Sequence, residues 1–269
     1  MATATVIGLG EAGALYARGL AAAGFEVHGY DPFTQLDDAA VAQHDDLVEA
    51  LRPAELVLTF VGARAARAVT EQVLGALAQL GGEHRPLLAD CNTGSPALKR
   101  ELGELAAAQT IPFVDIAVLA PVPRAGAQTP LMVSGAAADD FVARFAPVGA
   151  DVESIGGEPG DAAARKLIRS AFMKGLAGVI LESVGAGEAA GCGDWIRGQI
   201  VSELSGDASA FVERLIVGSR QHAERRIHEV EDASEYLRSI EQPSWSTDAA
   251  GNWLRRLHAE NATVPADAH

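Results

Sequence analysis

Three glycines near the start of the sequence have a spacing that can hold a nucleotide. Gly8, Gly10 and Gly13 follow the apolar run TATVI as G-x-G-x-x-G. In a dinucleotide-binding turn the first glycine permits a tight bend, the second lets the backbone approach a pyrophosphate, and the third lets a helix pack on the strand. The same spacing also fits an ordinary strand-to-helix turn, and a methyltransferase can carry a glycine-rich first turn. The motif therefore needs support from other residues.

Asp31 gives that support. It ends the segment EVHGYD, at the place where an acidic residue about 20 positions past the glycines accepts the hydroxyl protons of an adenosine ribose. A carboxylate there repels a 2′-phosphate, and the stretch from Tyr30 to Thr34 contains no Lys or Arg to bind one. These residues predict a dinucleotide site that favours NAD over NADP.

Lys166 is the residue with the clearest potential for proton transfer. It lies near the start of a segment, residues 161–187, that is apolar on most faces at helical spacing, which predicts a helix buried between two domains. Ser170 shares a side of this helix with Lys166, and Lys174 lies further round. Partial burial lowers the pKa of a lysine and suits it to exchange a proton with a substrate oxygen. The alternative is a lysine whose ammonium simply reaches solvent at the first turn.

The elements around these residues alternate between strand and helix patterns. Apolar β-rich runs at TATVIGL, EVHGYD, AELVLTFV, PLLADC and PFVDIAVL are separated by helix-length segments, and TPLMVSG adds one more strand before a further helix. Such alternation predicts a Rossmann-type, doubly wound, mainly parallel α/β sheet. The first helix is expected to end at Gly24, and Ser95 and Pro96 are expected to begin another.

The pattern changes after the Gly- and Pro-rich residues 156–160. Almost no strand signal follows, so we expect a small all-α C-terminal domain. The predicted domains are residues 1–158, which bind the dinucleotide, and residues 159–269, which comprise the long interdomain helix and a helical substrate or dimerisation domain.

Composition excludes several classes of partner. The chain has 269 residues, 48% of them hydrophobic, and a formal charge of −15, which argues against nucleic acid and anionic membranes. Cys91 and Cys192 form no disulfide framework or metal pair, and no His and carboxylate cluster has metal-ligand spacing. With no leader pattern and no membrane-spanning apolar run, we expect a cytoplasmic protein without a metal.

The ordered motifs resemble those of a known family. GLGEAG, YDP, DCNTGSP, VDIAVLAPVPRAGAQTPLMVSG and GDAAARKLIRSAFMKG occur in the order found in β-hydroxyacid dehydrogenases, which include 3-hydroxyisobutyrate and 6-phosphogluconate dehydrogenases. The segment RQHAERRIHEVEDA is similar to the C-terminal domain of the phosphogluconate dehydrogenase-like branch. The resemblance covers nearly the whole chain.

The resemblance implies a role for each matching residue. Lys166 matches the catalytic lysine that exchanges the proton of a substrate hydroxyl while hydride passes between the substrate carbon and the nicotinamide. Asn92 and Thr93 would lie close to the nicotinamide, Asn92 and Ser170 would assist catalysis, and Val61 and Gly62 would border the nicotinamide ribose. The pyrophosphate turn would comprise Gly8, Leu9, Gly10, Glu11, Ala12 and Gly13, with Asp31 on the ribose. The implied activity is NAD(P)-dependent oxidoreduction of a small hydroxy acid or related alcohol.

Departures from the family pattern fall where substrate is recognised. The family has a Ser-Gly-Gly run whose amides hold a carboxylate, whereas this sequence has Leu119, Ala120 and Pro121, and proline has no N–H. We expect substrate contacts at Val118, Leu119, Ala120 and Lys174 that differ from those of the family. Ser170 replaces the usual asparagine one turn after the lysine. The C-terminal residues His222, Arg225, Arg226 and Glu229 either contact substrate, from the same or a partner subunit, or form a solvated face.

Two other functions remain open at the level of sequence. Imine reductases use the same scaffold but usually lack the lysine, and a regulatory protein could bind NAD without turning it over. We expect a homodimer, because an all-α domain of about 80 residues has a limited core of its own.

Overall fold

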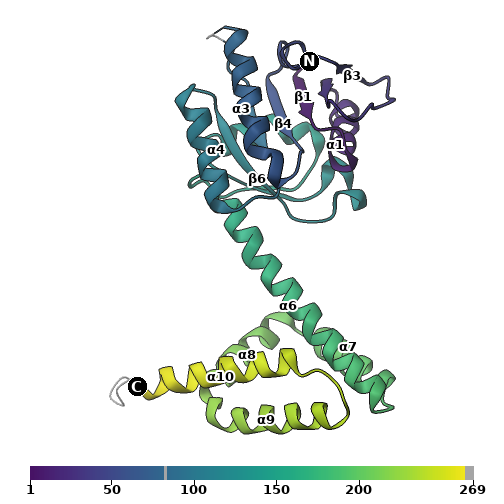
Figure 1. Ribbon diagram of the computed structural model, residues 1–269, viewed down its shortest axis with the longest axis vertical. Coiled ribbons are helices and arrows are strands. Elements are labelled where there is room, and N and C mark those ends of the chain that lie inside the picture. Colours follow the sequence, from purple (N-terminus) through teal and green to yellow (C-terminus); the bar gives the residue numbers. More distant parts are fainter. Residues whose placement is uncertain (82–83, 264–269) are drawn as a thin grey trace. The chain divides into compact units, whose positions relative to one another are not determined.

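The computed structural model describes residues 1–81 and 84–263. Its N-terminal part is an eight-stranded sheet flanked by helices (Figure 1). In chain order its elements are β1 (Thr3–Ile7), α1 (Glu11–Ala22), β2 (Glu26–Tyr30), β3 (Val41–His44), α2 (Leu47–Leu51), β4 (Leu56–Thr59), α3 (Ala63–Gln79), β5 (Leu87–Asp90), α4 (Pro96–Ala108), β6 (Phe113–Val118), β7 (Leu131–Ser134), α5 (Ala138–Phe145) and β8 (Val152–Ser154).

The strand order is β3-β2-β1-β4-β5-β6-β7-β8. Every neighbouring pair is parallel except β6 and β7, which are antiparallel. This topology confirms the predicted doubly wound, mainly parallel sheet. The strand order reverses between β1 and β4, and ligands of such sheets bind outside the carboxyl ends of the strands at that point.

Two apolar cores cover the two faces of the sheet. On one face, α1 and α5 contribute Tyr16, Leu20, Phe141 and Phe145. On the other face, α2, α3 and α4 pack against β1, β4, β5 and β6 through side chains such as Leu51, Leu74, Leu77 and Leu102. Strands β1, β4 and β5 are buried along their whole length, as expected for parallel strands covered on both sides.

The ends of two helices follow the local sequence signals. Ser95 begins α4 by accepting a hydrogen bond from the Leu98 amide at 3.2 Å, with Pro96 at the first helical position. Gly24 follows the end of α1 with φ +89°, a left-handed conformation that glycine adopts without strain. Both predicted boundaries are confirmed.

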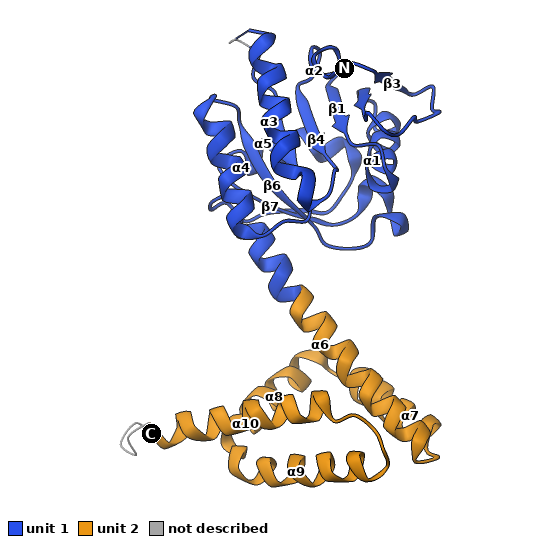
Figure 2. Ribbon diagram, viewed as in Figure 1, with its two compact units in different colours: residues 1–169 blue, residues 170–269 orange. Residues whose placement is uncertain are grey.

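The chain divides into two compact units, residues 1–169 and 170–269 (Figure 2). The division falls inside one helix, α6 (Asp161–Ala189), and not at the predicted boundary at residue 158. The physical reason is that the first turns of α6 belong to the sheet unit, since Ala162 and Ala163 are buried there and their amides bond to it.

The second unit is helical throughout its described residues. After α6 come α7 (Gly193–Leu204), α8 (Ala208–Gln221), α9 (Ala223–Ser239) and α10 (Trp245–Thr263). Asp248 joins α9 to α10 by accepting hydrogen bonds from Ser234 and Arg238. The predicted small all-α C-terminal part is confirmed. No helix among the described residues combines the length and apolarity that spanning a bilayer requires.

The prediction that α6 is buried is wrong for the single chain. Ile168, Phe172 and Leu181 are 72%, 63% and 73% exposed. The apolar side chains of α6 led to the prediction of burial. A sequence pattern, however, does not identify the surface that would cover those side chains.

Candidate active site

The glycine turn links β1 to α1 as predicted. The Gly8 amide donates to the Tyr30 carbonyl at 2.9 Å, and Gly8 has φ +88°. A Cβ at Gly8 would overlap the Phe60 carbonyl oxygen, and one at Gly13 would overlap the Gly8 carbonyl oxygen. A Cβ at Gly10 would meet no atom within 4 Å. Gly8 and Gly13 are therefore needed for packing, whereas Gly10 leaves open space beside the helix terminus.

The residues of this turn fit a pyrophosphate. Among the described residues, no side chain caps the N-terminus of α1, so the first amides of the helix remain available to an anion. Ala12 is half-buried at this terminus. Glu11 is exposed, so its carboxylate lies in solvent, where it also interacts favourably with the helix dipole.

Asp31 holds the turn as well as the end of β2. One carboxylate oxygen accepts the Leu9 amide at 2.8 Å, and the other accepts the amides of Phe33 and Thr34 at 2.9 and 3.0 Å. The carboxylate is half-buried beside the turn. Three of its four lone-pair sites are then used, and the oxygen that binds Leu9 can still accept one hydroxyl proton.

Asn92 binds the loop that follows β4. Its side-chain oxygen accepts the amides of Val61 and Gly62 at 2.6 and 3.0 Å. Its side-chain nitrogen donates to Thr59 and Asp90. All four hydrogen-bonding positions of the Asn92 amide are thus used within the protein. Asn92 fixes the backbone of Val61 and Gly62, which lie beside the glycine turn because β4 pairs with β1.

Lys166 lies next to Thr93 at the carboxyl ends of the strands. The Lys166 ammonium donates to the Thr93 hydroxyl at 3.3 Å, although the two residues are far apart in sequence. Burial lowers the pKa of Lys166, and the nearby charge of Lys99 lowers it further. A lysine with a lowered pKa is a better acid and base near neutral pH than an exposed one.

A buried ion cluster, which sequence reasoning missed, lies beneath Lys166. Lys99 of α4 is 1% exposed, and its ammonium lies 2.7 Å from Asp90 of β5 and 3.0 Å from Asp115 of β6. Burial disfavours the Lys99 charge, but the two carboxylates outweigh burial and raise the pKa of Lys99. A signal existed in the sequence, because Asp90 and Asp115 lie within apolar strand runs, where a charge needs a partner.

Asp115 also binds the start of α6. Its second oxygen accepts the amides of Gly160 and Ala163, both at 3.0 Å. Ser134 of β7 accepts the Ala162 amide at 3.0 Å. These bonds satisfy amides that have no partner within the helix, and they fix the turn of α6 that precedes Lys166.

The segment that departs from the family pattern follows β6 and packs against α1. The Leu119 amide donates to the Pro130 carbonyl at 2.9 Å, while Val118 pairs with Leu131. Two short 3-10 turns follow, η1 (Val122–Arg124) and η2 (Gly126–Gln128). A Cβ at Gly19 of α1 would overlap Ala127, so η2 lies directly against α1. Val118, Leu119 and Ala120 stay half-buried at the end of β6.

The remaining predicted residues belong to the second unit. Lys174 donates to Ser170 at 2.8 Å. Arg225 pairs with Glu229 at 3.0 Å, Arg226 donates to Ser219 at 3.0 Å, and His222 stands between α8 and α9. Contact between these side chains and a substrate stays a prediction.

Comparison with protein families identifies the family of the N-terminal unit. Residues 3–155 match the family model described as the NAD binding domain of 6-phosphogluconate dehydrogenase. The chain belongs to this family. The predicted resemblance is therefore confirmed, and with it membership of a family of nicotinamide-dependent dehydrogenases and reductases. Residues 188–257 match a domain of unknown function, DUF1932. Comparison with curated proteins returns no match.

Solved structures of similar fold cover 97% or more of this chain. An imine reductase variant from Myxococcus stipitatus in complex with NAD+ is 20% identical, with a TM-score of 0.82 over 98% of this chain and 95% of that one. An imine reductase from the same organism in complex with NADP+ is 19% identical, with a TM-score of 0.78 over 97% and 95%. A conserved hypothetical protein from Sinorhizobium meliloti 1021 is 27% identical, with a TM-score of 0.62 over 100% and 91%. The imine reductases support the fold that this chain shares with them.

Proposed function

We propose that the protein is an NAD-dependent oxidoreductase that acts on a small hydroxy acid or related alcohol, with Lys166 as the general acid and base. The observation that carries this proposal is the half-buried amine of Lys166 beside Thr93, at the same edge of the sheet as the glycine turn. Family membership supports the nicotinamide cofactor.

In this mechanism Lys166 moves one proton. During oxidation the neutral amine takes the proton of the substrate hydroxyl, and during reduction the ammonium returns it to the carbonyl oxygen. The nicotinamide, when bound, accepts or supplies the hydride. Thr93 holds the Lys166 amine through its hydroxyl. Burial, which lowers the pKa of Lys166, increases the share of neutral amine available for the oxidation.

The preference for NAD rests on Asp31. Its carboxylate is held in place by three backbone amides, so it cannot easily move away from a ligand that carries a 2′-phosphate. A hydroxyl group of an unphosphorylated ribose can instead donate to its remaining free lone pair.

A Lys166→Met variant tests the catalytic proposal. We expect turnover to fall by about 10²- to 10⁴-fold, the usual contribution of a general acid or base, while NADH binding is retained. Arg165→Met is the matched control, because Arg165 is an exposed cation at the adjacent position of α6. Full turnover by Lys166→Met on a substrate of the wild-type protein would refute the role of Lys166.

A Gly10→Ala variant tests the cofactor site separately. Because a Cβ at Gly10 would meet no atom within 4 Å, the fold should be unaffected. A bound pyrophosphate would occupy that space, so NADH affinity should fall while the melting temperature stays unchanged. Unchanged affinity would mean that the cofactor binds elsewhere.

Reduction of a C=N bond is the second candidate. It is favoured by the absence of amide donors at Pro121 and Pro123, because a cyclic imine has no carboxylate to be held there. Screening cyclic imines beside hydroxy acids, with oxidation of reduced nicotinamide as the readout, separates the two reactions.

We also propose a homodimer formed through the helical unit. Among the described residues 170–263, the buried apolar side chains are Ala223 and Leu254, whereas Phe172, Val201 and Trp253 are 63%, 63% and 62% exposed. Exposed apolar area of this extent is typical of an interface. A monomer in light scattering at all tested concentrations would contradict the dimer.

A further inference from the structure

Lys99 is a buried cation for which the proposed reaction has no direct use. The sequence contains three lysines, Lys99, Lys166 and Lys174. Lys99 is 1% exposed, so it cannot contact a substrate. A buried lysine needs counter-charges, and an apolar residue at this position would avoid that requirement. Its contacts therefore indicate what the charge does.

Those contacts connect Lys99 to the helix that carries Lys166. The Lys99 ammonium lies 3.0 Å from one oxygen of Asp115, and the other oxygen of Asp115 accepts the Gly160 and Ala163 amides at 3.0 Å. Lys166 follows Ala163 by one helical turn. A single carboxylate thus joins the buried cation of α4 to the first turn of α6.

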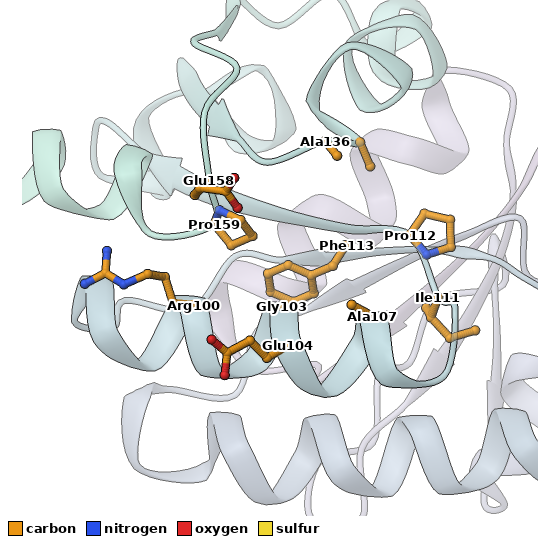
Figure 3. A pocket seen from close by; sticks show the side chains of 11 residues that line it. Arg100, Gly103, Glu104, Ala107, Ile111, Pro112, Phe113, Ala136, Glu158 and Pro159 are labelled. Carbon is orange, nitrogen blue, oxygen red and sulfur yellow. The ribbon is translucent and has the colours of Figure 1, made fainter.

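Close packing strengthens the same connection. A Cβ at Gly160 would meet the Pro96 carbonyl oxygen at 2.5 Å, so the start of α6 lies directly against the start of α4. Pro159 packs on α4 at Gly103, where an added Cβ would approach it to 2.8 Å. Figure 3 shows Pro159 beside the ring of Phe113 and above the turn of α4 that holds Gly103, at the edge of a cavity of about 440 Å³.

We propose that Lys99 is a positioning residue of the reaction: through Asp115 it fixes the first turn of α6 and thereby holds the Lys166 amine beside Thr93. The proposal rests on the proposed role of Lys166. In this proposal α4 packs on the sheet and also, through Lys99, fixes the position of the Lys166 amine.

The cluster also sets the electrostatic surroundings of Lys166. Burial is the largest influence and lowers the pKa of Lys166, and the Lys99 charge from α4 lowers it further. Asp115 of β6 acts in the opposite direction. Burial raises the pKa of the Cys91 thiol, so this group, which follows β5, stays neutral and adds no charge near Lys166. Loss of the Lys99 charge should consequently raise the pKa of Lys166.

The test measures Lys166 directly by NMR. Protein labelled with ¹³C at the lysine ε carbon has one signal for each of its three lysines, and each signal reports the protonation of its amine during a pH titration. The variant is Lys99→Met/Asp90→Asn, which removes one positive and one negative charge and so leaves the net charge of the cluster unchanged. In the wild type we expect the Lys166 midpoint to lie below the value of about 10.4 of a free lysine.

In the double variant we expect the Lys166 midpoint to rise toward that of a free lysine. Amide hydrogen exchange at Gly160 and Ala163 should become faster, and the alkaline shift should appear in the pH profile of kcat with little change in the KM for cofactor. The single variant Lys99→Arg keeps the positive charge, so its Lys166 midpoint should equal that of the wild type. Leu102→Ala, a buried change on α4 outside the cluster, should leave it unchanged despite lower stability.

An unchanged Lys166 midpoint and unchanged exchange in the folded double variant would overturn the inference. A midpoint shift of the same size in Leu102→Ala would also overturn it, because the effect would then follow from lower stability alone. Failure of the proposed function looks different. The wild type would show no turnover of hydroxy acids, whereas the NMR titration would still report whether Lys99 controls Lys166.

Discussion

Replacing Lys99 by Met should destabilise the sheet unit strongly. Met keeps most of the apolar stem of Lys99 but removes the charge that lies 2.7 Å from Asp90 and 3.0 Å from Asp115. Both carboxylates are at most 1% exposed, so water cannot replace the lost ammonium. Removing one partner of a buried ion pair costs about 3–5 kcal/mol.

This cost can be converted into a melting temperature. For a domain of about 150–250 residues, 1 kcal/mol corresponds to roughly 2–4 °C. The expected fall for Lys99→Met is therefore roughly 6–20 °C. In Lys99→Met/Asp90→Asn the loss should be smaller, about 1–3 kcal/mol, the cost of one unsatisfied buried acceptor, because a neutral amide replaces one of the two carboxylates that lose their counter-charge.

The assay is urea unfolding of the three proteins at several pH values. The folded-state pKa of Lys99 is raised, so its contribution is complete below the unfolded value of about 10.4 and is lost as pH rises through the folded value. The difference between wild type and Lys99→Met should thus be constant around neutral pH and smaller in strong alkali. A loss below about 1 kcal/mol at neutral pH, or a double variant less stable than Lys99→Met, would refute this reasoning.

Four further changes have defined outcomes. Gly13→Ala should lower the melting temperature, because its Cβ would overlap the Gly8 carbonyl oxygen, whereas Gly10→Ala should not. Asp31→Ser should strengthen NADPH binding relative to NADH binding in paired titrations, since the charge that repels a 2′-phosphate is lost. An unchanged ratio of the two dissociation constants would contradict the proposed role of Asp31. Ser95→Ala should cost about 1 kcal/mol in urea unfolding, because it removes the hydrogen bond that caps α4; no loss would show that solvent replaces this cap. The rate of alcohol oxidation should rise with pH through a pKa below that of a free lysine, which is about 10.4. Burial lowers the pKa of Lys166, and loss of its proton produces the neutral amine that acts as the base. A rise at or above the free value would show that another group controls the rate.

Local signals were sufficient for much of the fold. The glycine spacing and Asp31 predicted a dinucleotide-binding turn, and in the structure the Leu9 amide of that turn donates a hydrogen bond to Asp31. Ser95 and Pro96 predicted the start of α4. The short elements β3, β8 and α2, of 4, 3 and 5 residues, were missed. Strands β4 and β5 also have 4 residues, but they were predicted because they lie in longer apolar runs, which β3 and β8 do not. Without such a run, so few residues give too little periodicity to distinguish an element from a loop.

The ion cluster could not be predicted from local patterns. Lys99 and Asp115 come from different elements, and Asp115 binds amides 45 and 48 positions away. Sequence could indicate that buried charges need partners, but the choice among partners depended on the order of β5 and β6 in the sheet. Local patterns were also insufficient for α6. They showed that its faces are apolar, but they did not predict that these faces are exposed in the single chain.

The division of the chain within α6 has a consequence for how such a protein can diverge in sequence. Lys166 belongs to the unit that binds the cofactor, while the remainder of the 29-residue helix belongs to the other unit. The proposed acid–base group and the cofactor-binding unit are therefore inherited together. Substitutions in residues 170–263 leave in place the bonds that hold the Lys166 amine, so the helical unit can diverge while the proposed proton-transfer group keeps its position.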